Sequence, residues 1–301
     1  MSVYHTPVML YESVDALCVK AGGTYVDVTF GGGGHSTEIL NRLNNKGKLF
    51  AFDRDADALA NTINDKRFTL IRNNFRYIRN LLRYEGVEQV DGILADLGVS
   101  SFQFDTAERG FSFRFDAALD MRMNQQSELT AANVLNTYSE ADLNFIFKVY
   151  GEVENTPRVV RLIIARRNEK PIETIGELLE TVKPCLPRLT EHKYLAKLFQ
   201  ALRIEANSEM HALEQLLVQS LKLLKPDGRL VVITYHSLED RLVKNFMRSG
   251  NVEGKIEKDF FGKEQTPFLV ITRKAMIPTE NEIQKNTRAR SAKLRVAKMK
   301  S

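Results

Sequence analysis

The sequence predicts an α/β fold in which a doubly wound parallel sheet is interrupted by an inserted all-helical domain. Short apolar runs of strand character alternate with helical stretches up to residue 96. From residue 106 to residue 194 only helical patterns follow, and strand-like runs then resume. A βαβα progression is typical of a parallel sheet with helices on both faces. We therefore expect a discontinuous sheet domain formed by residues 1–105 and 195–301, and a helical domain formed by residues 106–194.

In the first part of the chain, four short apolar runs have the length and composition of buried strands. They cover residues 25–30, 48–53, 68–72 and 90–96, and helical patterns lie between them at 36–43, 56–63 and 77–84. The helical insert carries start signals of its own. These are Ser139 with Asp142, Thr156 with Pro157, and Thr174 with Glu177.

After the insert, we expect a helix over residues 195–224 that is broken near Asn207 and Ser208. The residues Lys-Pro-Asp-Gly at 225–228 predict a turn that leads into a strand over 229–235. His236 opens the next helix, and the last strand is expected at 268–272. A strand near 252–258 is only weakly marked.

Composition and charge limit the class of protein. Hydrophobic content of 43% and charged content of 27% are ordinary for a globular chain, and no apolar run is long enough to span a membrane. The first residues carry no pattern of a secretory signal. Two distant cysteines, Cys18 and Cys185, fit neither a disulfide framework nor a metal motif, so a reducing cytoplasm is expected.

The net charge of +5 is concentrated near the C-terminus, where residues 285–300 hold seven basic side chains and no acid. Such a basic tail suits contact with phosphates, and a solvated terminal helix is the alternative interpretation.

A glycine-rich turn is the strongest functional signal. Gly31 to Gly34 follow the first strand and precede a helix, so that bare backbone N–H groups face a ligand there. Asp53 ends the next strand, nineteen positions after Gly34, at the spacing of an acid that binds a ribose. We expect an adenosine-containing cofactor. The glycines alone do not separate NAD from S-adenosylmethionine. Asp27 would repel a pyrophosphate and attract a methionine ammonium. Taken alone, it is at least as well explained as an acid that ends a strand or caps a helix.

Several longer strings resemble the RsmH (MraW) family of bacterial rRNA methyltransferases, and they extend in order from His5 to the C-terminus. They cover residues 27–36, 96–103, 109–113, 119–123, 199–204, 236–241 and 288–295. The resemblance implies a Rossmann-like class I methyltransferase sheet and a helical insert that helps to bind RNA. It also implies an enzyme that uses S-adenosyl-L-methionine to methylate N4 of a cytidine in the decoding region of 16S rRNA in the small ribosomal subunit.

Carried onto this sequence, the cofactor contacts of the family fall on Gly33, Gly34, His35, Asp53, Phe75, Asp96 and Gln103. From the residues themselves, Asp53 could instead cap the following helix, and Phe75 could be a core residue. For His35 we expect the backbone N–H to be the useful group. No group of side chains has the spacing of metal ligands, so no metal is expected.

Asp96 is the predicted catalytic residue. It ends the fourth strand, and a carboxylate there could accept a hydrogen bond from the cytosine amine and take up positive charge as the methyl group is transferred. The alternative role is to orient a loop. Tyr235, His236 and Ser237 follow the fifth strand of the sheet and could form part of a pocket for the base.

The segment from Arg109 to Arg122 interleaves arginines with phenylalanines, which suits RNA, or else a packed linker. Arg158, Arg161, Arg166 and Arg167 of the insert could extend a phosphate-binding face. A nicotinamide-dependent oxidoreductase and a non-catalytic RNA-binding assembly factor are the competing functions. The sequence leaves open whether the chain forms a homodimer and whether naked rRNA or an assembled subunit is the substrate.

Overall fold

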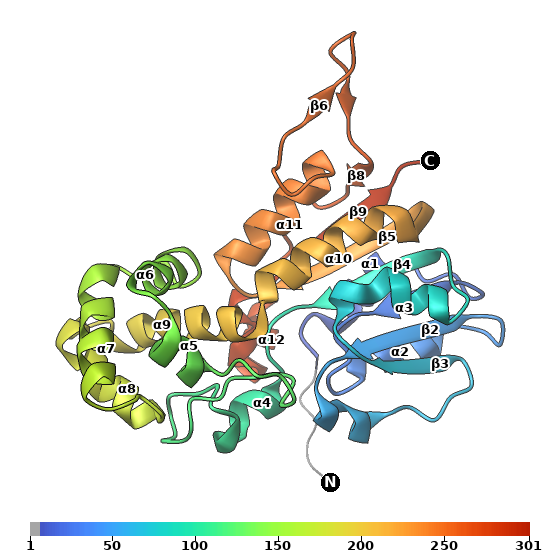
Figure 1. Ribbon diagram of the computed structural model, residues 1–301. Helices are drawn as coiled ribbons and strands as arrows, with labels where there is room; N and C mark the ends of the chain where they lie inside the picture. The colour runs from blue at the N-terminus through green and yellow to red at the C-terminus, as the bar shows by residue number, and fades with distance from the viewer. Residues whose placement is uncertain (1–6) are drawn as a thin grey trace. The chain divides into compact units, whose positions relative to one another are not determined.

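The computed structural model describes residues 7–301 of the chain. The first six residues lie outside the described residues. They include His5, the first residue of the strings that resemble the family, and most of the N-terminal segment in which no secretory signal is expected. The chain forms two compact units (Figure 1). One contains the chain up to Gly98 together with Met210–Ser301, and the other contains Val99–Glu209. No helix within residues 7–301 is long and apolar enough to cross a membrane.

The first unit is built on a seven-stranded sheet with the order β3-β2-β1-β4-β5-β9-β8. Strands β1 to β5 are parallel to one another, whereas β9 is antiparallel to both of its neighbours. The strands are β1 (Thr24–Asp27), β2 (Lys48–Asp53), β3 (Phe68–Arg72), β4 (Val90–Asp96), β5 (Leu224–Thr234), β8 (Phe268–Val270) and β9 (Lys293–Met299). The predicted doubly wound, Rossmann-like sheet is confirmed, and the bounds of β2, β3 and β4 agree with the prediction.

Helices cover both faces of this sheet because successive strand residues point to opposite sides. Val26 packs in the apolar cluster that includes residues of α3, α10 and α11, and its neighbour Tyr25 packs in the cluster that includes residues of α1 and α2. The helical segments of this unit are α1 (Leu10–Ala16), α2 (Gly34–Arg42), η1 (Ala56–Asn61), η2 (Phe75–Tyr77), α3 (Ile78–Tyr84), α10 (Glu209–Leu223), α11 (Ser237–Ser249), α12 (Glu280–Lys285) and η5 (Thr287–Ser291).

A small hairpin extends from the sheet unit after α11 (Figure 1). It pairs β6 (Glu257–Lys258) with β7 (Glu264–Gln265), which is the region where the sequence marks a strand only weakly. The predicted turn at 225–228 interrupts the pairing of β4 with β5. Val90 pairs with Leu224 but Gly92 pairs with Arg229, so the four turn residues lie outside the regular ladder.

Strand β9 corrects two expectations about the C-terminus. Residues 293–299 form neither a solvated helix nor a free tail, and the strand at 268–270 is not the last one. Leu294, Val296 and Ala297 are buried between β5 and β8, which gives this segment an apolar reason to pair with the sheet. The basic side chains that alternate with them hide this pattern in the sequence.

The second unit is helical and has its own apolar core. Its helices are α4 (Ser101–Asp105), η3 (Ala107–Arg109), α5 (Ala131–Thr137), α6 (Glu140–Val149), α7 (Thr156–Glu169), α8 (Ile175–Val182), η4 (Lys183–Cys185) and α9 (Glu191–Asn207). Ser139 caps α6 and Thr174 forms the capping box of α8, as predicted. Helix α7 instead has Asn155 as its N-cap, one residue before the predicted one.

The boundaries of the helical unit lie at residues 99 and 209 rather than at 106 and 194. The difference at the C-terminal side arises from α9, whose residues Leu195, Leu198 and Leu202 are buried in the core of the helical unit. The predicted break near residues 207–208 is confirmed, because Asn207 ends α9 and Ser208 adopts a left-handed conformation before α10 begins.

Candidate functional site

The candidate site lies at the carboxyl ends of β1 and β4. These two strands are neighbours at the centre of the sheet, and the strand order reverses between them. In open α/β sheets the crevice at such a switch point is where ligands bind. Asp27 is the last residue of β1 and Asp96 is the last residue of β4, so the topology brings both acids to this edge.

The loop between β1 and α2 is shaped so that only glycine fits at its end. Gly33 is the N-cap of α2 and has a positive φ of 78°. A Cβ atom on Gly34 would lie 2.1 Å from Cγ of Pro7, and one on Gly33 would lie 3.0 Å from the ring of Phe30. The glycines therefore let Pro7 and Phe30 pack closely against the start of α2, a helix end whose N–H groups favour electronegative ligand atoms.

Asp53 holds this loop from the end of β2. Its Oδ2 accepts a hydrogen bond from the Gly31 N–H at 2.8 Å, and its Oδ1 accepts one from the Asp55 N–H at 2.8 Å. Burial raises its pKa to about 6, although these two N–H groups act in the opposite direction. The cap of η1 is Asp55 and not Asp53, so the alternative role of Asp53 as a helix cap is wrong. Each of its oxygens retains a lone pair for a ribose hydroxyl.

Asp27 is fully buried and is used by the fold. Its Oδ2 accepts a hydrogen bond from Ser36 Oγ at 2.7 Å, and its Oδ1 accepts one from the Thr29 N–H at 3.1 Å. Burial raises its pKa, because desolvation of the charged form outweighs these hydrogen bonds. The contacts are those of a strand-end acid that joins the glycine loop to α2.

Asp96 is less enclosed, with 21% of its side chain exposed. Tyr235 Oη donates a hydrogen bond to its Oδ1 at 2.7 Å, and His35 Nδ1 lies 3.9 Å from its Oδ2. Burial raises the pKa of Asp96 to about 6; His35 and Tyr235 lower it, while the nearby acids Asp27 and Glu239 raise it. The site therefore contains a carboxyl group that titrates close to neutral pH and has capacity to accept a further hydrogen bond.

The imidazole of His35 faces Asp96, although the sequence directs attention only to the His35 backbone. The side chain is 5% exposed, and burial lowers its pKa, which keeps it neutral at pH 7. Desolvation outweighs the charge of Asp96 and a backbone hydrogen bond with Val8, both of which favour the protonated imidazole. The ring is therefore packed between Asp96 and the backbone at Val8.

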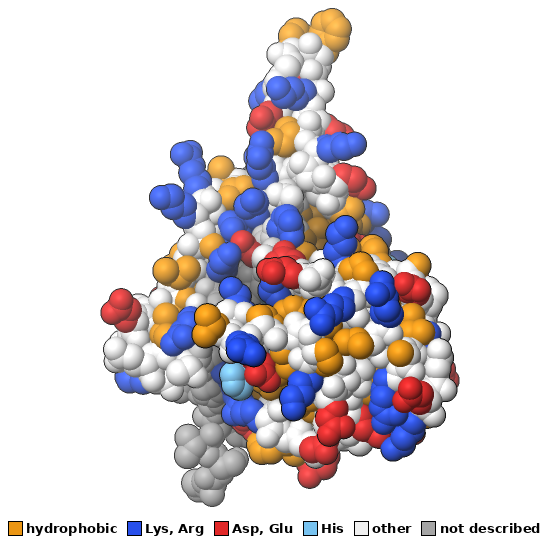
Figure 2. Space-filling model, turned by 90° about the vertical axis from the view of Figure 1, so that its left-hand side faces the viewer, with side chains coloured by type: hydrophobic (Ala, Val, Ile, Leu, Met, Phe, Trp, Pro, Cys, Tyr) orange, Lys and Arg blue, Asp and Glu red, His pale blue; other side chains and the backbone are white. Residues whose placement is uncertain are grey.

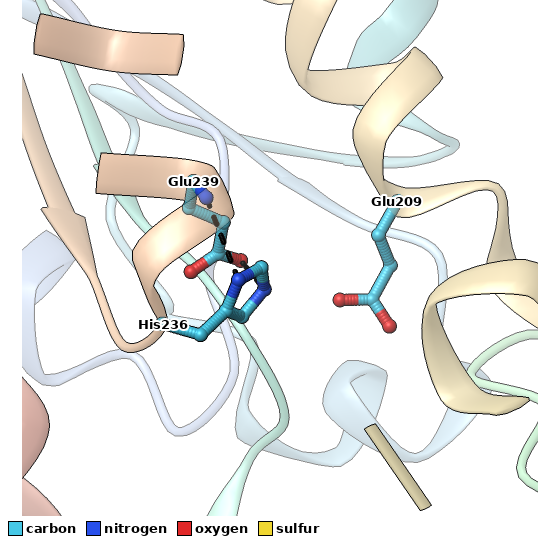
Figure 3. Close-up of side chains that lie close together, drawn as sticks. All are labelled: Glu209, His236 and Glu239. Atoms are coloured by element: carbon cyan, nitrogen blue, oxygen red, sulfur yellow. Dashed lines mark hydrogen bonds and ion pairs between the residues drawn. The ribbon is translucent and has the colours of Figure 1, made fainter. Parts of the chain in front are cut away.

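Tyr235 and the start of α11 complete the edge of the site, and Figure 3 shows His236 and Glu239 of this segment. His236 caps α11 by accepting a hydrogen bond from the Glu239 N–H at 3.4 Å, and its Nε2 lies 3.2 Å from Glu239 Oε1. The Tyr235 N–H donates to Glu239 Oε2 at 3.0 Å. Sequence reasoning finds residues 235–237 but misses Glu239. The three-residue spacing from the capping His236 is the signal that could have identified it.

The remaining predicted cofactor residues lie further along the chain. Phe75 begins η2 directly after β3, and it is half-buried against the main apolar cluster of the sheet unit. Gln103 belongs to the helical unit, where it forms a capping box with Ser100 at the start of α4 and is 5% exposed. Contact of either residue with a cofactor stays a prediction.

In the segment from Arg109 to Arg122, the two terminal arginines form hydrogen bonds and an ion pair within the protein. Arg109 is 3% exposed and donates to the carbonyl groups of Arg122 and Met123. Arg122 pairs with Asp120 and donates to the Ser127 carbonyl group. These contacts fit the packed-linker interpretation at both ends of the segment.

Comparison with known proteins identifies the family. The model of the MraW methylase family matches residues 2–300. The chain is 59% identical to the ribosomal RNA small subunit methyltransferase H of Bacteroides thetaiotaomicron, over 99% of this chain and 98% of that protein. The protein of the same name from Flavobacterium johnsoniae is 56% identical over 98% of this chain and 97% of its own length.

Proposed function

The chain belongs to the MraW methylase family, and we propose that it transfers a methyl group from S-adenosyl-L-methionine to N4 of a cytidine in the decoding region of 16S rRNA. The predicted resemblance to this family is thus confirmed, and S-adenosylmethionine, rather than a nicotinamide, is the cofactor. The observation that carries the proposed chemistry is Asp96, a hydrogen-bond acceptor with a raised pKa at the carboxyl end of a central strand.

The residues at the switch point fit this cofactor. Gly33 and Gly34 form the N-terminal end of α2, where N–H groups could bind the cofactor, and Asp53 offers oxygens to the ribose hydroxyls. Phe75 and Gln103 are proposed contacts from the family resemblance, with the Phe75 ring against the adenine. The partly exposed carboxyl group of Asp96 would place negative charge near a positively charged cofactor.

Asp96 would act on the amine that receives the methyl group. When bound, S-adenosylmethionine supplies an electrophilic methyl group on a positively charged sulfur. The N4 amine of cytosine is a poor nucleophile because its lone pair is delocalised into the ring. An Asp96 oxygen that accepts one N–H favours a tetrahedral nitrogen and stabilises the positive charge that develops there. With a pKa of about 6, the same carboxyl group can take up the proton that the nitrogen loses.

Tyr235 would position Asp96 for this role. Its hydroxyl group donates to Oδ1 and thereby leaves Oδ2 as the oxygen that faces away from it. Precise placement of an amine in line with the methyl group supplies much of the rate in such transfers. We further propose that the helical unit contributes to RNA recognition, as the family resemblance implies.

The test is methyl transfer from labelled S-adenosylmethionine to small ribosomal subunits purified from a strain that lacks this gene. Mass spectrometry of the nucleosides and of mapped rRNA fragments identifies the product. N4-methylated cytidine in the decoding region is the expected result, and subunits from the parent strain, already methylated, serve as the matched control. Label at another position, or no label despite cofactor binding, would overturn the proposed substrate.

A further inference from the structure

A polar cavity lies in the sheet unit, between the segment η2–α3 and helix α10. Its volume is about 400 Å³. Among the residues that the structure describes, no carboxylate lines it, and the lining consists of Arg76, Tyr77, Arg79, Asn80, His211, Gln215 and Gln219. We refer to it as the α3–α10 pocket. Its two guanidinium groups give the cavity a positive charge and several N–H donors, and the imidazole and amide groups make the rest of the lining polar.

Gln219 joins the two walls of this pocket through hydrogen bonds to the backbone of η2 and α3. The side chains of Arg76 and Arg79 take no part in these bonds. Gln219 Nε2 donates a hydrogen bond to the Arg76 carbonyl group at 2.7 Å. Its Oε1 accepts one from the Arg79 N–H at 3.1 Å. Both bonds involve the backbone of η2 and α3, so α10 is fastened to this segment whatever side chains occupy positions 76 and 79.

The two guanidinium groups are not engaged in ionic or hydrogen-bonded contacts among the described residues. Within residues 7–301, neither Arg76 nor Arg79 has an ion pair or a side-chain hydrogen bond, and the buried Nε of Arg76 lacks any partner. Arginine is suited to planar, two-point recognition of phosphate. The Arg76 guanidinium lies over the Tyr77 ring at 4.6 Å, and Tyr77 is 44% exposed. An aromatic ring and an arginine plane side by side form a surface on which an unpaired base can stack.

We propose that the α3–α10 pocket binds a phosphate of single-stranded RNA, with an adjacent base on the exposed Tyr77 ring. The inference rests on the proposed function, in which RNA is the substrate. It adds a contact surface in the sheet unit itself, beginning one residue after Phe75. A buried donor that is unpaired in the free protein would gain an acceptor on binding, which is a source of affinity that a solvated surface arginine lacks.

The test compares the double variant Arg76→Gln/Arg79→Gln with Arg83→Gln. Arg83 lies on the same helix, is 56% exposed and does not line the pocket, so its loss removes charge without touching the site. Binding is measured over a range of salt concentrations with two probes, small subunits that lack the modification and a short single-stranded RNA. We expect about tenfold weaker binding for the double variant. The slope of log K against log salt should fall by about 1.4, as for two lost contacts to a single strand. Arg83→Gln should bind with an affinity close to that of the unaltered protein.

Two further measurements keep the outcome interpretable. Unchanged melting temperature and unchanged affinity for S-adenosylmethionine show that the double variant is folded. Arg76→Lys should recover the salt slope but only part of the affinity, because lysine retains the charge without the planar fork. If the double variant and the unaltered protein bind RNA equally well, the α3–α10 pocket is not an RNA-binding site, even if methyl transfer to rRNA occurs. If the unaltered protein transfers no methyl group to rRNA, the proposed function fails, and the short RNA alone decides on the pocket.

Discussion

Strand β9 and the carboxyl ends of β1 and β4 both contain ionisable side chains with little exposure to solvent. In β9 these side chains form ion pairs, whereas the acids at the ends of β1 and β4 have no lysine or arginine partner within residues 7–301. In β9, Arg295 is 8% exposed and donates to both oxygens of Asp240, which Lys293 also approaches at 3.3 Å. At the ends of β1 and β4, the fully buried Asp27 lies near Asp96, which is partly buried. Their side-chain oxygens have hydroxyl partners, and no lysine or arginine pairs with either acid within residues 7–301.

The contrast separates charges that the fold neutralises from charges that it leaves for a ligand. Burial would raise the pKa of Asp240, yet the hydrogen bonds and charges of Arg295 and Lys293 lower it overall. For Asp96 burial prevails, and its pKa rises to about 6. Closely placed acids without a cationic partner cost stability and are found at functional sites for that reason. The paired charges of β9 need no such explanation.

The largest effect is expected for Asp96→Asn. The amide keeps the shape of the side chain but loses the negative charge that stabilises the reacting amine. Methyl transfer to small subunits should therefore fall by about 10²- to 10⁴-fold in kcat. The free energy of unfolding should not decrease at pH 7, since a buried, desolvated charge is removed. Tyr235→Phe is the matched control for positioning and should cause a smaller loss. Full activity of Asp96→Asn would place Asp96 among the purely structural acids.

A large effect on stability, in contrast, is expected for Arg295→Ala in β9. It leaves Asp240 buried beside Lys293 alone, and removal of one partner from a buried pair costs about 3 kcal/mol. Urea denaturation measures the change. Lys298→Ala is the control on the same strand, because its partner Asp227 is exposed, and it should unfold almost like the unaltered protein. Equal stability of the two variants would show that the pairs of β9 are equivalent, and that burial does not distinguish them.

The contrast also explains which parts of the molecule could be read from the sequence. Local patterns are sufficient for β2, β3 and β4 and for the break between α9 and α10, because apolar runs and helix ends are short-range signals. They fail for β9, where Lys293, Arg295 and Lys298 resemble a solvated tail. Their partners Asp240 and Asp227 lie on other elements, so only the tertiary structure reveals that these charges are paired.

The candidate site shows the same limit. Asp53 and Asp96 follow from their positions at strand ends together with the glycine turn. The hydrogen bond from Tyr235 to Asp96 joins residues 139 positions apart, and no sequence pattern specifies it. Arg76 and Arg79 are inconspicuous in the sequence as well. Their importance depends on the absence of partners within the described residues, which only the folded chain can show.

The smallest effect, and the sharpest test of the contrast, is the pH dependence of stability for Asp96→Asn and Asp240→Asn. The folded pKa of Asp96, about 6, is above its ordinary value of 3.8. Its contribution to stability is therefore fully present below about pH 3.8 and is lost as the pH rises through 6. The folded pKa of Asp240 is below 3.8, so its contribution is present above that value and is lost only as the pH falls through the folded pKa.

Between about pH 4.5 and pH 6 the two variants should therefore behave differently in urea denaturation. The stability of the unaltered protein relative to Asp96→Asn should decline with rising pH, whereas its advantage over Asp240→Asn should stay constant. Asp53, whose pKa is also raised to about 6, is present in all three proteins and cancels in the comparison. If the free energy of unfolding depended on pH in the same way for both variants, the pKa of Asp96 would not be raised in the folded protein. The two regions would then differ in their contacts but not in the pKa of their acids.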